Sequence, residues 1–229
     1  MKIEVRDDAV LIDGYVNAVE RDSKVLRDKR GSFIEKIQAG AFQRSLDRAK
    51  KSHYDVKVLL NHDYDRELTS TADSATNIRE DSIGLRCTCE IRDADVIQKA
   101  KDGKLKGWSF GFISLKDERS ADTTPVHREV RELDLREVSI LDDTKIPAYD
   151  GTSIEIETRD DVIEIRASIE NDEIELVDRS TNNSDPIPDL HEWEIVTWLL
   201  ERIGALNNTI NSKNYGGKKH EFKEVFGNA

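Results

Sequence analysis

The chain has 229 residues, 37% hydrophobic and 36% charged, which is enough for one domain with a modest core plus an appendage. Its formal net charge of −12 argues against general binding to nucleic-acid phosphates, which requires clustered Lys and Arg side chains. No stretch approaches the roughly 18 apolar residues that span a bilayer, and the N-terminus lacks an apolar signal core. We therefore expect a cytoplasmic protein that has neither nucleic acid nor membrane as a partner.

The N-terminal part of the chain, up to His62, contains three strand-like patterns and one helix-like pattern. Residues 9–20 and 34–37 read as strands. Residues 41–51 place apolar side chains at helical spacing with charged side chains between them, which predicts an amphipathic surface helix. Residues 56–62 alternate between two faces and predict a strand whose apolar face ends in a histidine, His62.

The part that follows, up to Leu141, predicts three more strands and a short helix. Residues 83–91 read as a strand, and residues 93–101 suit a helix that ends at Asp102-Gly103. A strand through Ser109 follows, and after a polar loop residues 133–141 alternate again. An ionisable side chain, Glu137, stands in the otherwise apolar row of that last strand.

The two cysteines, Cys87 and Cys89, lie two apart in a predicted strand. Their side chains share one face but are poorly placed to bond each other. A Cys-x-Cys pair also lacks the further ligands that a zinc site needs. We interpret both as small strand residues, and we expect neither a metal nor another cofactor.

The character of the chain changes after residue 150. Residues 151–185 carry eleven acidic and three basic side chains, and therefore two thirds of the net charge, yet their apolar residues alternate as in strands. Residues 180–188 read as a linker, and a helix with an apolar stripe is predicted from Asp189 to about Asn207. We expect three parts: a main domain over 1–150, an acidic β-rich extension and linker over 151–185, and a C-terminal helix with a flexible tail over 186–229.

The segment Gly107-Trp108-Ser109-Phe110-Gly111 matches G-x-S-x-G, the nucleophile elbow of α/β-hydrolases. An elbow follows a buried apolar strand and precedes a helix, whereas residues 99–106 are mostly charged and residues 108–113 keep a strand period of two. The best-placed histidine, His62, also precedes the serine, although in those enzymes the histidine comes last. An α/β-hydrolase esterase is therefore the weaker interpretation, and a helix directly after Ser109 would revive it.

A serine hydroxyl needs a neighbouring base, usually a histidine held by a third group. Ser109, His62 and Glu137 offer one candidate for each role, and Gly111 leaves the serine's face of the strand free of a side chain. Each also fits a structural role: a hydrogen-bonded histidine, an ordinary strand serine, and a glutamate paired with an arginine such as Arg86. From the residues alone the triad is a hypothesis.

Six motifs in the same order resemble the prohead serine proteases of tailed phages, the capsid-maturation proteases related to herpesvirus assemblin. They cover roughly residues 12–150 and read Gly14-Tyr15-Val16, Gly31 to Phe42, Leu59-Leu60-Asn61-His62-Asp63, Glu80 to Leu85, Ser109-Phe110-Gly111-Phe112 and Leu135-Arg136-Glu137-Val138-Ser139. The resemblance implies an α+β, mainly β fold: an antiparallel-rich β-barrel flanked by helices, here with a C-terminal β and helical extension.

The same resemblance implies roles for particular residues. His62 would be the general base, Ser109 the nucleophile, and Glu137 the orienting group in the place of the second histidine of the herpesvirus enzymes. The segment that supplies the oxyanion hole in those relatives corresponds to residues around Lys145 and Ile146, where we expect backbone N–H donors. Gly111 would leave room for the substrate.

The implied function is that of a serine endopeptidase that acts inside the immature procapsid in the host cytoplasm. Its substrates would be the major capsid protein, in its N-terminal region or scaffold segment, and the protease itself, with self-cleavage expected between residues 180 and 189. A homo-oligomer is possible, since the herpesvirus relatives form dimers. The alternative from another class is a catalytically inactive assembly or scaffold factor on the same fold.

Overall fold

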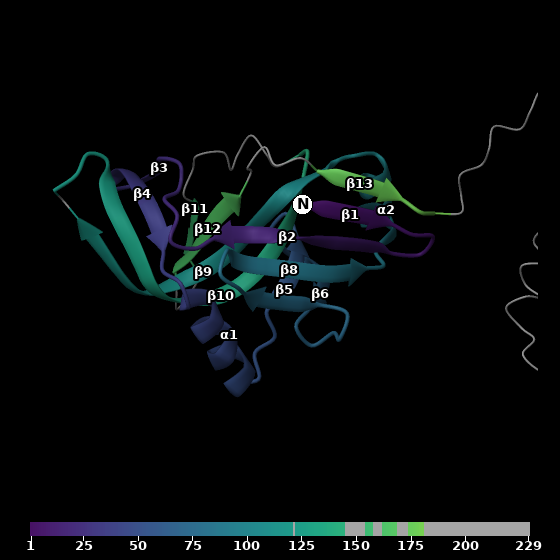
Figure 1. The fold of residues 1–229 in the computed structure, drawn as a ribbon, viewed down its shortest axis with the longest axis horizontal. Coiled ribbons are helices and arrows are strands. Elements are labelled where there is room, and N and C mark those ends of the chain that lie inside the picture. Colours follow the sequence, from purple (N-terminus) through teal and green to yellow (C-terminus); the bar gives the residue numbers. More distant parts are fainter. Residues whose placement is uncertain (121, 145–153, 158–161, 169–173, 181–229) are drawn as a thin grey trace, which may run out of the picture. The chain divides into compact units, whose positions relative to one another are not determined.

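The computed structural model describes residues 1–120, 122–144, 154–157, 162–168 and 174–180, which contain thirteen strands and two helices (Figure 1). Their bounds, in chain order, are β1 Lys2–Val5, β2 Val10–Ala18, β3 Leu26–Asp28, β4 Gly31–Ile37, α1 Ala41–Lys51, β5 Lys57–Leu60, β6 Asp63–Ser70, β7 Asn77–Glu80, β8 Gly84–Ile91, α2 Ala94–Lys101, β9 Leu105–Ser120, β10 Val126–Asp142, β11 Ile154–Glu157, β12 Val162–Ser168 and β13 Glu175–Asp178.

The described strands form two mixed sheets. The smaller has the order β13-β1-β2-β8-β7, and the larger has the order β11-β12-β9-β10-β4-β3, with β5 also paired to β10 and β6 paired to β5. Most neighbours are antiparallel, whereas β1 with β13 and β10 with β4 and β5 are parallel. β10 therefore connects the larger sheet: β9 runs along one side of it, and β4 and β5 follow each other along the other side.

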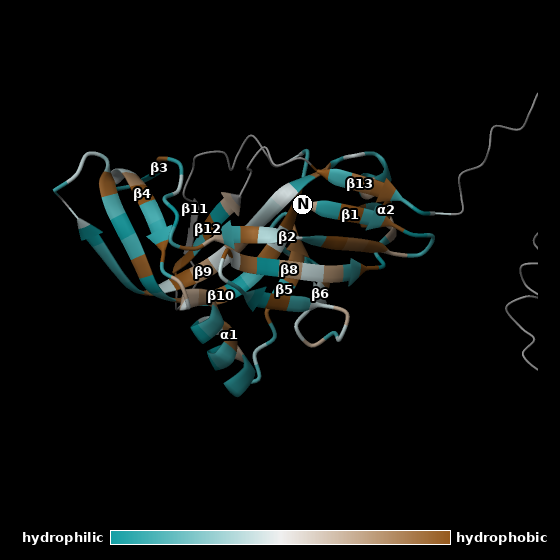
Figure 2. Ribbon diagram, in the orientation of Figure 1, coloured by the Kyte–Doolittle hydropathy of each residue, from teal (hydrophilic) through white to brown (hydrophobic). Residues whose placement is uncertain are grey.

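The side-chain period of two explains how β10 contributes to the core. Leu133 and Leu135 are buried two apart, and register irregularities before Leu133 and after Leu135 bring Val130 and Val138 into the core as well. In Figure 2 hydrophobic and hydrophilic bands alternate along this region of the sheet. These side chains join one hydrophobic cluster that includes residues of both sheets and both helices. Residues of β9 and β10 therefore pack in one continuous core with residues of both sheets and both helices.

Helix α1 packs on the larger sheet through Phe42, whose ring meets Phe110 of β9 edge to face with centroids 5.4 Å apart. Its start depends on Gly40, which has a φ of 83°, a conformation that glycine adopts without cost. The Glu80 carboxylate accepts hydrogen bonds from the backbone N–H groups of Gly40 and Gln43 at 2.5 and 2.8 Å. This acidic group at the helix N-terminus satisfies donors that the helix itself leaves unpaired.

The expected fold class, mainly β with flanking helices and mostly antiparallel pairing, is confirmed. The predicted helices at 41–51 and 93–101 are confirmed as α1 and α2, and Asp93 caps α2 by accepting from the Val96 N–H at 3.0 Å. The sheets differ from the implied barrel, because the strands described do not close into a ring. No helix in the described ranges is long and apolar enough to cross a membrane.

The acidic extension contributes strands to both sheets, as its alternating pattern indicated. β12 pairs with β9, and β13 pairs with β1, so these strands extend sheets whose other partners come from the expected main domain. The boundary proposed at residue 150 stays a prediction. The linker after Ser180 and the helix predicted from Asp189 lie outside the described residues.

Candidate active site

Ser109 lies within β9, a continuous strand that runs on to Ser120. No helix follows it, and β9 is antiparallel to both of its neighbours. A nucleophile elbow requires a parallel strand and a following helix, so the α/β-hydrolase interpretation is wrong. The serine is fully buried between β10 and β12.

His62 lies in a turn rather than in the strand that the sequence predicted for it. β5 ends at Leu60, and Asn61 and His62 form the two-residue turn into β6, with Leu60 opposite Asp63. Both turn residues have positive φ angles, 57° and 61°, as in a type I′ hairpin turn. Asn and His enter this region more readily than most residues, and the turn directs the imidazole back over the sheet.

The turn is held by hydrogen bonds to the end of β10. The Asn61 N–H donates to the Ile140 carbonyl at 2.9 Å, and the Asn61 Oδ1 accepts from the Asp142 N–H at 3.0 Å. Burial acts to raise the pKa of Asp142, but hydrogen bonds from Thr144 outweigh it and the pKa is lowered. The carboxylate thus fixes the residues that follow β10, while the Asp142 backbone N–H holds the turn.

The structure brings His62, Ser109 and Glu137 together in one row. His62 Nε2 lies 2.7 Å from Ser109 Oγ, and His62 Nδ1 lies 2.7 Å from Glu137 Oε1. Both ionisable side chains are almost fully buried, with 4% and 2% of their surface exposed. A carboxylate only accepts hydrogen bonds, so this geometry suits the imidazole tautomer whose Nδ1 carries the hydrogen and whose Nε2 can accept one from the serine.

Glu137 and the serine come from adjacent strands. Glu137 pairs with Gly111 in the register of β10 and β9, and Ser109 pairs with Ser139, so all four side-chain positions share one face of the sheet. An ideal Cβ on Gly111 would stand 2.5 Å from Glu137 Oε1 and 3.3 Å from the Ile163 side chain. The glycine expected to leave room for a substrate therefore also leaves room for the Glu137 carboxylate.

Ser139 is a member of the site that the sequence interpretation did not assign. Its hydroxyl donates to Glu137 Oε2 at 2.6 Å and accepts from the His62 backbone N–H at 3.0 Å. It thus links the Glu137 carboxylate to the backbone of His62. The available signal was its position two residues after Glu137, on the same strand face.

This geometry can carry out general-base activation of a hydroxyl. The acceptor nitrogen lies within hydrogen-bond reach of the serine, and the third group fixes the imidazole from the other side. Lys145 and Ile146, expected near the oxyanion hole, lie outside the described residues. Within the part of the chain that is described, no group of three His, Cys, Asp or Glu side chains is arranged to hold a metal ion.

Comparison with known protein families gives a match that covers the elements from β1 to β11. The model of the family Peptidase_S78, described as caudovirus prohead serine protease, matches residues 1–164, which include all three residues of the row. No curated protein and no solved structure gives a significant match.

Proposed function

Because the chain belongs to the caudovirus prohead serine protease family, we propose that it is an active endopeptidase that uses Ser109, His62 and Glu137 to cleave procapsid proteins. The observation that carries this proposal is the unbroken row of two 2.7 Å contacts from Glu137 through His62 to Ser109. A family name does not assign these roles, and the geometry supports them.

The first half of the proposed reaction forms an acyl-enzyme. Ser109 Oγ attacks the carbonyl carbon of the scissile peptide bond while His62 Nε2 takes the hydroxyl proton. The tetrahedral intermediate then expels the amine, to which His62 returns the proton, and an ester to Ser109 remains. We expect backbone N–H groups around residues 145 and 146 to stabilise the oxyanion, as the family resemblance implies.

The second half restores the enzyme. His62 takes a proton from water, the resulting hydroxide attacks the ester, and Ser109 leaves with the proton that His62 returns. Glu137 accepts a hydrogen bond from Nδ1–H throughout the reaction, without taking the proton, and stabilises the imidazolium that forms in each half. Ser139 acts as a positioning residue because it holds the second oxygen of that carboxylate.

We propose that the substrates are the major capsid protein, in its N-terminal region or scaffold segment, and the protease itself. Family membership supports an action on capsid and scaffold proteins during head maturation, and therefore a place inside the procapsid in the host cytoplasm. For self-cleavage we keep the polar linker between residues 180 and 189. An intact C-terminus after prolonged incubation of active enzyme would argue against that position.

Co-expression with the capsid protein of the same phage tests the function. We expect Ser109→Ala and His62→Ala each to reduce processing by a factor on the order of 10⁴ to 10⁶, because the nucleophile and base act as a unit. Ser120→Ala, an exposed serine at the end of the same strand, is the matched control and should process normally. Unchanged processing in both site variants would show that the assignment is wrong.

Labelling with a serine-directed fluorophosphonate separates the enzyme from an inactive assembly factor. A single adduct on Ser109, absent in His62→Ala, supports the enzyme, because only an activated serine reacts at an appreciable rate. Normal head assembly with Ser109→Ala and no adduct in the wild type would favour the assembly factor.

A further inference from the structure

The serine strand is paired on both sides. At residues 108–112, β9 pairs with β10 on one edge and with β12 on the other, and Ser109 stands opposite Ala167 (Figure 1). β12 comes from the acidic extension, far later in the chain than β9. Without β12 this part of β9 would be an open strand edge beside the nucleophile, and an open edge is a template for an extended peptide.

The main chain of β12 meets the nucleophile directly. Ser109 Oγ donates to the Arg166 carbonyl oxygen at 2.8 Å, while His62 Nε2 lies 2.7 Å from the same Oγ. A hydroxyl has one hydrogen, so when it bonds to the Arg166 carbonyl it is not available to the neutral imidazole. The Arg166 carbonyl thus already occupies the position beside Ser109 Oγ where the carbonyl group of a substrate peptide would bind.

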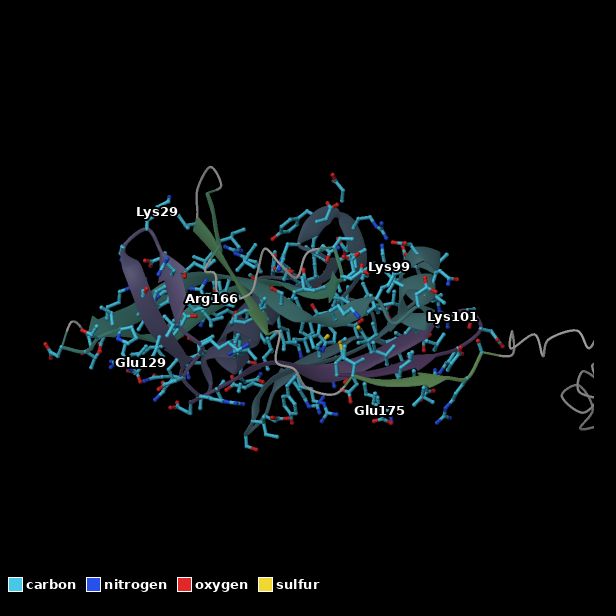
Figure 3. The ribbon with its side chains drawn as sticks, turned by 90° about the horizontal axis from the view of Figure 1, so that it is seen from above. Lys29, Lys99, Lys101, Glu129, Arg166 and Glu175 are labelled. Carbon is cyan, nitrogen blue, oxygen red and sulfur yellow. The ribbon has the colours of Figure 1, made fainter. Side chains whose placement is uncertain are left out.

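Two side chains of β12 are held by charges from other strands. Arg166 donates to both carboxylate oxygens of Glu35 on β4, at 2.8 and 3.0 Å, and Glu164 accepts from Arg128 on β10 at 2.7 Å. All four side chains are buried, and Figure 3 shows Arg166 in the interior of the side-chain cluster. Such bidentate pairing is selective in both geometry and charge.

The charged groups that bind these two β12 side chains, Glu35 and Arg128, lie on other strands. Glu35 and Arg128 are each 4% exposed and bond each other at 2.9 Å, and Arg128 also bonds Asp117 of β9 at 2.8 Å. These groups would remain if β12 left the edge, with a carboxylate ready for a basic side chain and a guanidinium ready for an acidic one. The spacing of two residues follows from the strand period.

From these contacts we infer that the β9 edge at residues 108–112 is the substrate-binding position and that β12 is its resident occupant. The substrates are extended peptide segments that carry an acidic and a basic residue two positions apart, in the order of Glu164 and Arg166, for Arg128 and Glu35. β12 must leave the edge before a substrate can bind. This inference rests on the proposed function, because it names the substrates of the same serine.

Release of β12 tests the occupancy. Arg166→Asp sets a carboxylate against Glu35 and should expel β12, so we expect fluorophosphonate labelling of Ser109 to become at least tenfold faster than in the wild type. Arg131→Asp, a charge reversal at a partly exposed position of β10, is the charge-matched control and should label at the wild-type rate. Unchanged or slower labelling in a folded Arg166→Asp protein would overturn the inference, because β12 would then be a fixed part of the site.

Binding in trans tests the charge pattern without any need for catalysis. The full chain with Ser109→Ala and Arg166→Asp is titrated with a fluorescent peptide of residues 162–168, VIEIRAS, and with VIRIEAS, in which the two charges are exchanged. We expect the exchanged peptide to bind at least tenfold more weakly. Equal affinities would refute the charge pattern, even where capsid processing still depends on Ser109 and the proposed function stands.

Discussion

Gly111 lies directly beneath the carboxylate of Glu137: a Cβ at this position would come within 2.5 Å of Glu137 Oε1. Real Cβ contacts are not this short, so a side chain here forces the acid to move. The affected oxygen is the one that holds the His62 Nδ1 hydrogen. The glycine thus connects the backbone of β9 to the orientation of the His62 imidazole.

We expect Gly111→Ala to lower kcat by about 10- to 100-fold, because small displacements of catalytic groups cost rates of that order. KM should change less, since the methyl group acts on Glu137. Steady-state kinetics on a cleavable capsid peptide measures both, and the melting temperature checks that the variant folds.

A double-mutant cycle identifies the cause. With Glu137→Ala already in place, Gly111→Ala should add little further loss, because its target carboxylate is gone. Fully additive losses would contradict the contact and point to a separate effect on β9.

Ser139→Ala removes a hydroxyl that bonds both the Glu137 carboxylate and the His62 backbone. Loss of a buried hydrogen bond to a charged group corresponds to about 1.5–3 kcal/mol, so we expect kcat to fall by roughly 10- to 100-fold. The pH profile of kcat should also shift, since the environment of the Glu137 carboxylate changes, whereas Ser120→Ala, at an exposed position of β9, should leave it unmoved. An unchanged profile with lower stability would make Ser139 purely structural.

Asn61 and His62 occupy a turn that most side chains disfavour, with φ angles of 57° and 61°. Asn61→Gly keeps the conformation accessible and loses the bond from the Asp142 N–H, whereas Asn61→Val adds a β-branched side chain to the left-handed region. We expect the valine variant to lose about 1–2 kcal/mol more stability than the glycine variant and to be less active. Denaturant unfolding compares the two, and equal stabilities would contradict the strained turn.

The period of two accounts for what the sequence predicted well. It places Glu137 and Ser139 on one face of β10 and carries β9 as a strand through Ser109, which is why the elbow spelled by Gly107 to Gly111 was misleading. Helix α1 could be predicted equally well, because the helical spacing of its apolar residues is a local pattern in the sequence. The fold class followed from these local patterns together with the family resemblance.

The turn at His62 could not be predicted from such a pattern. Asn-His does not match the Asn-Gly signal of a type I′ turn, so the predicted strand ran past the end of β5 and into the turn. The pairing of β12 with β9 was also not predictable from the sequence. Its strand pattern is local, but its partner β9 lies far away along the chain, and periodicity does not select a partner across such a separation.

The four buried charges around β12 make its docking sensitive to acid. Burial acts to raise the pKa of Glu164, but hydrogen bonds and charge from Arg128 and Arg166 outweigh it and hold that pKa below its ordinary value of 4.5. A carboxyl whose pKa is lowered by folding stabilises the docked state fully above about 4.5, and the contribution is lost as the pH falls through the lower folded value. Glu35 and Asp117 face the same guanidinium groups.

We therefore expect the free energy of opening of β12, measured by native-state amide exchange along this strand, to fall between pH 6 and pH 3. Glu164→Gln removes this carboxyl, so its opening free energy should be lower than that of the wild type by about 1–3 kcal/mol at pH 6, and the difference should shrink in acid. Glu118→Gln, an exposed acid on β9, is the control and should follow the wild type. A difference between wild type and Glu164→Gln that stays constant over this range would show that ionisation of Glu164 does not hold β12 on the sheet.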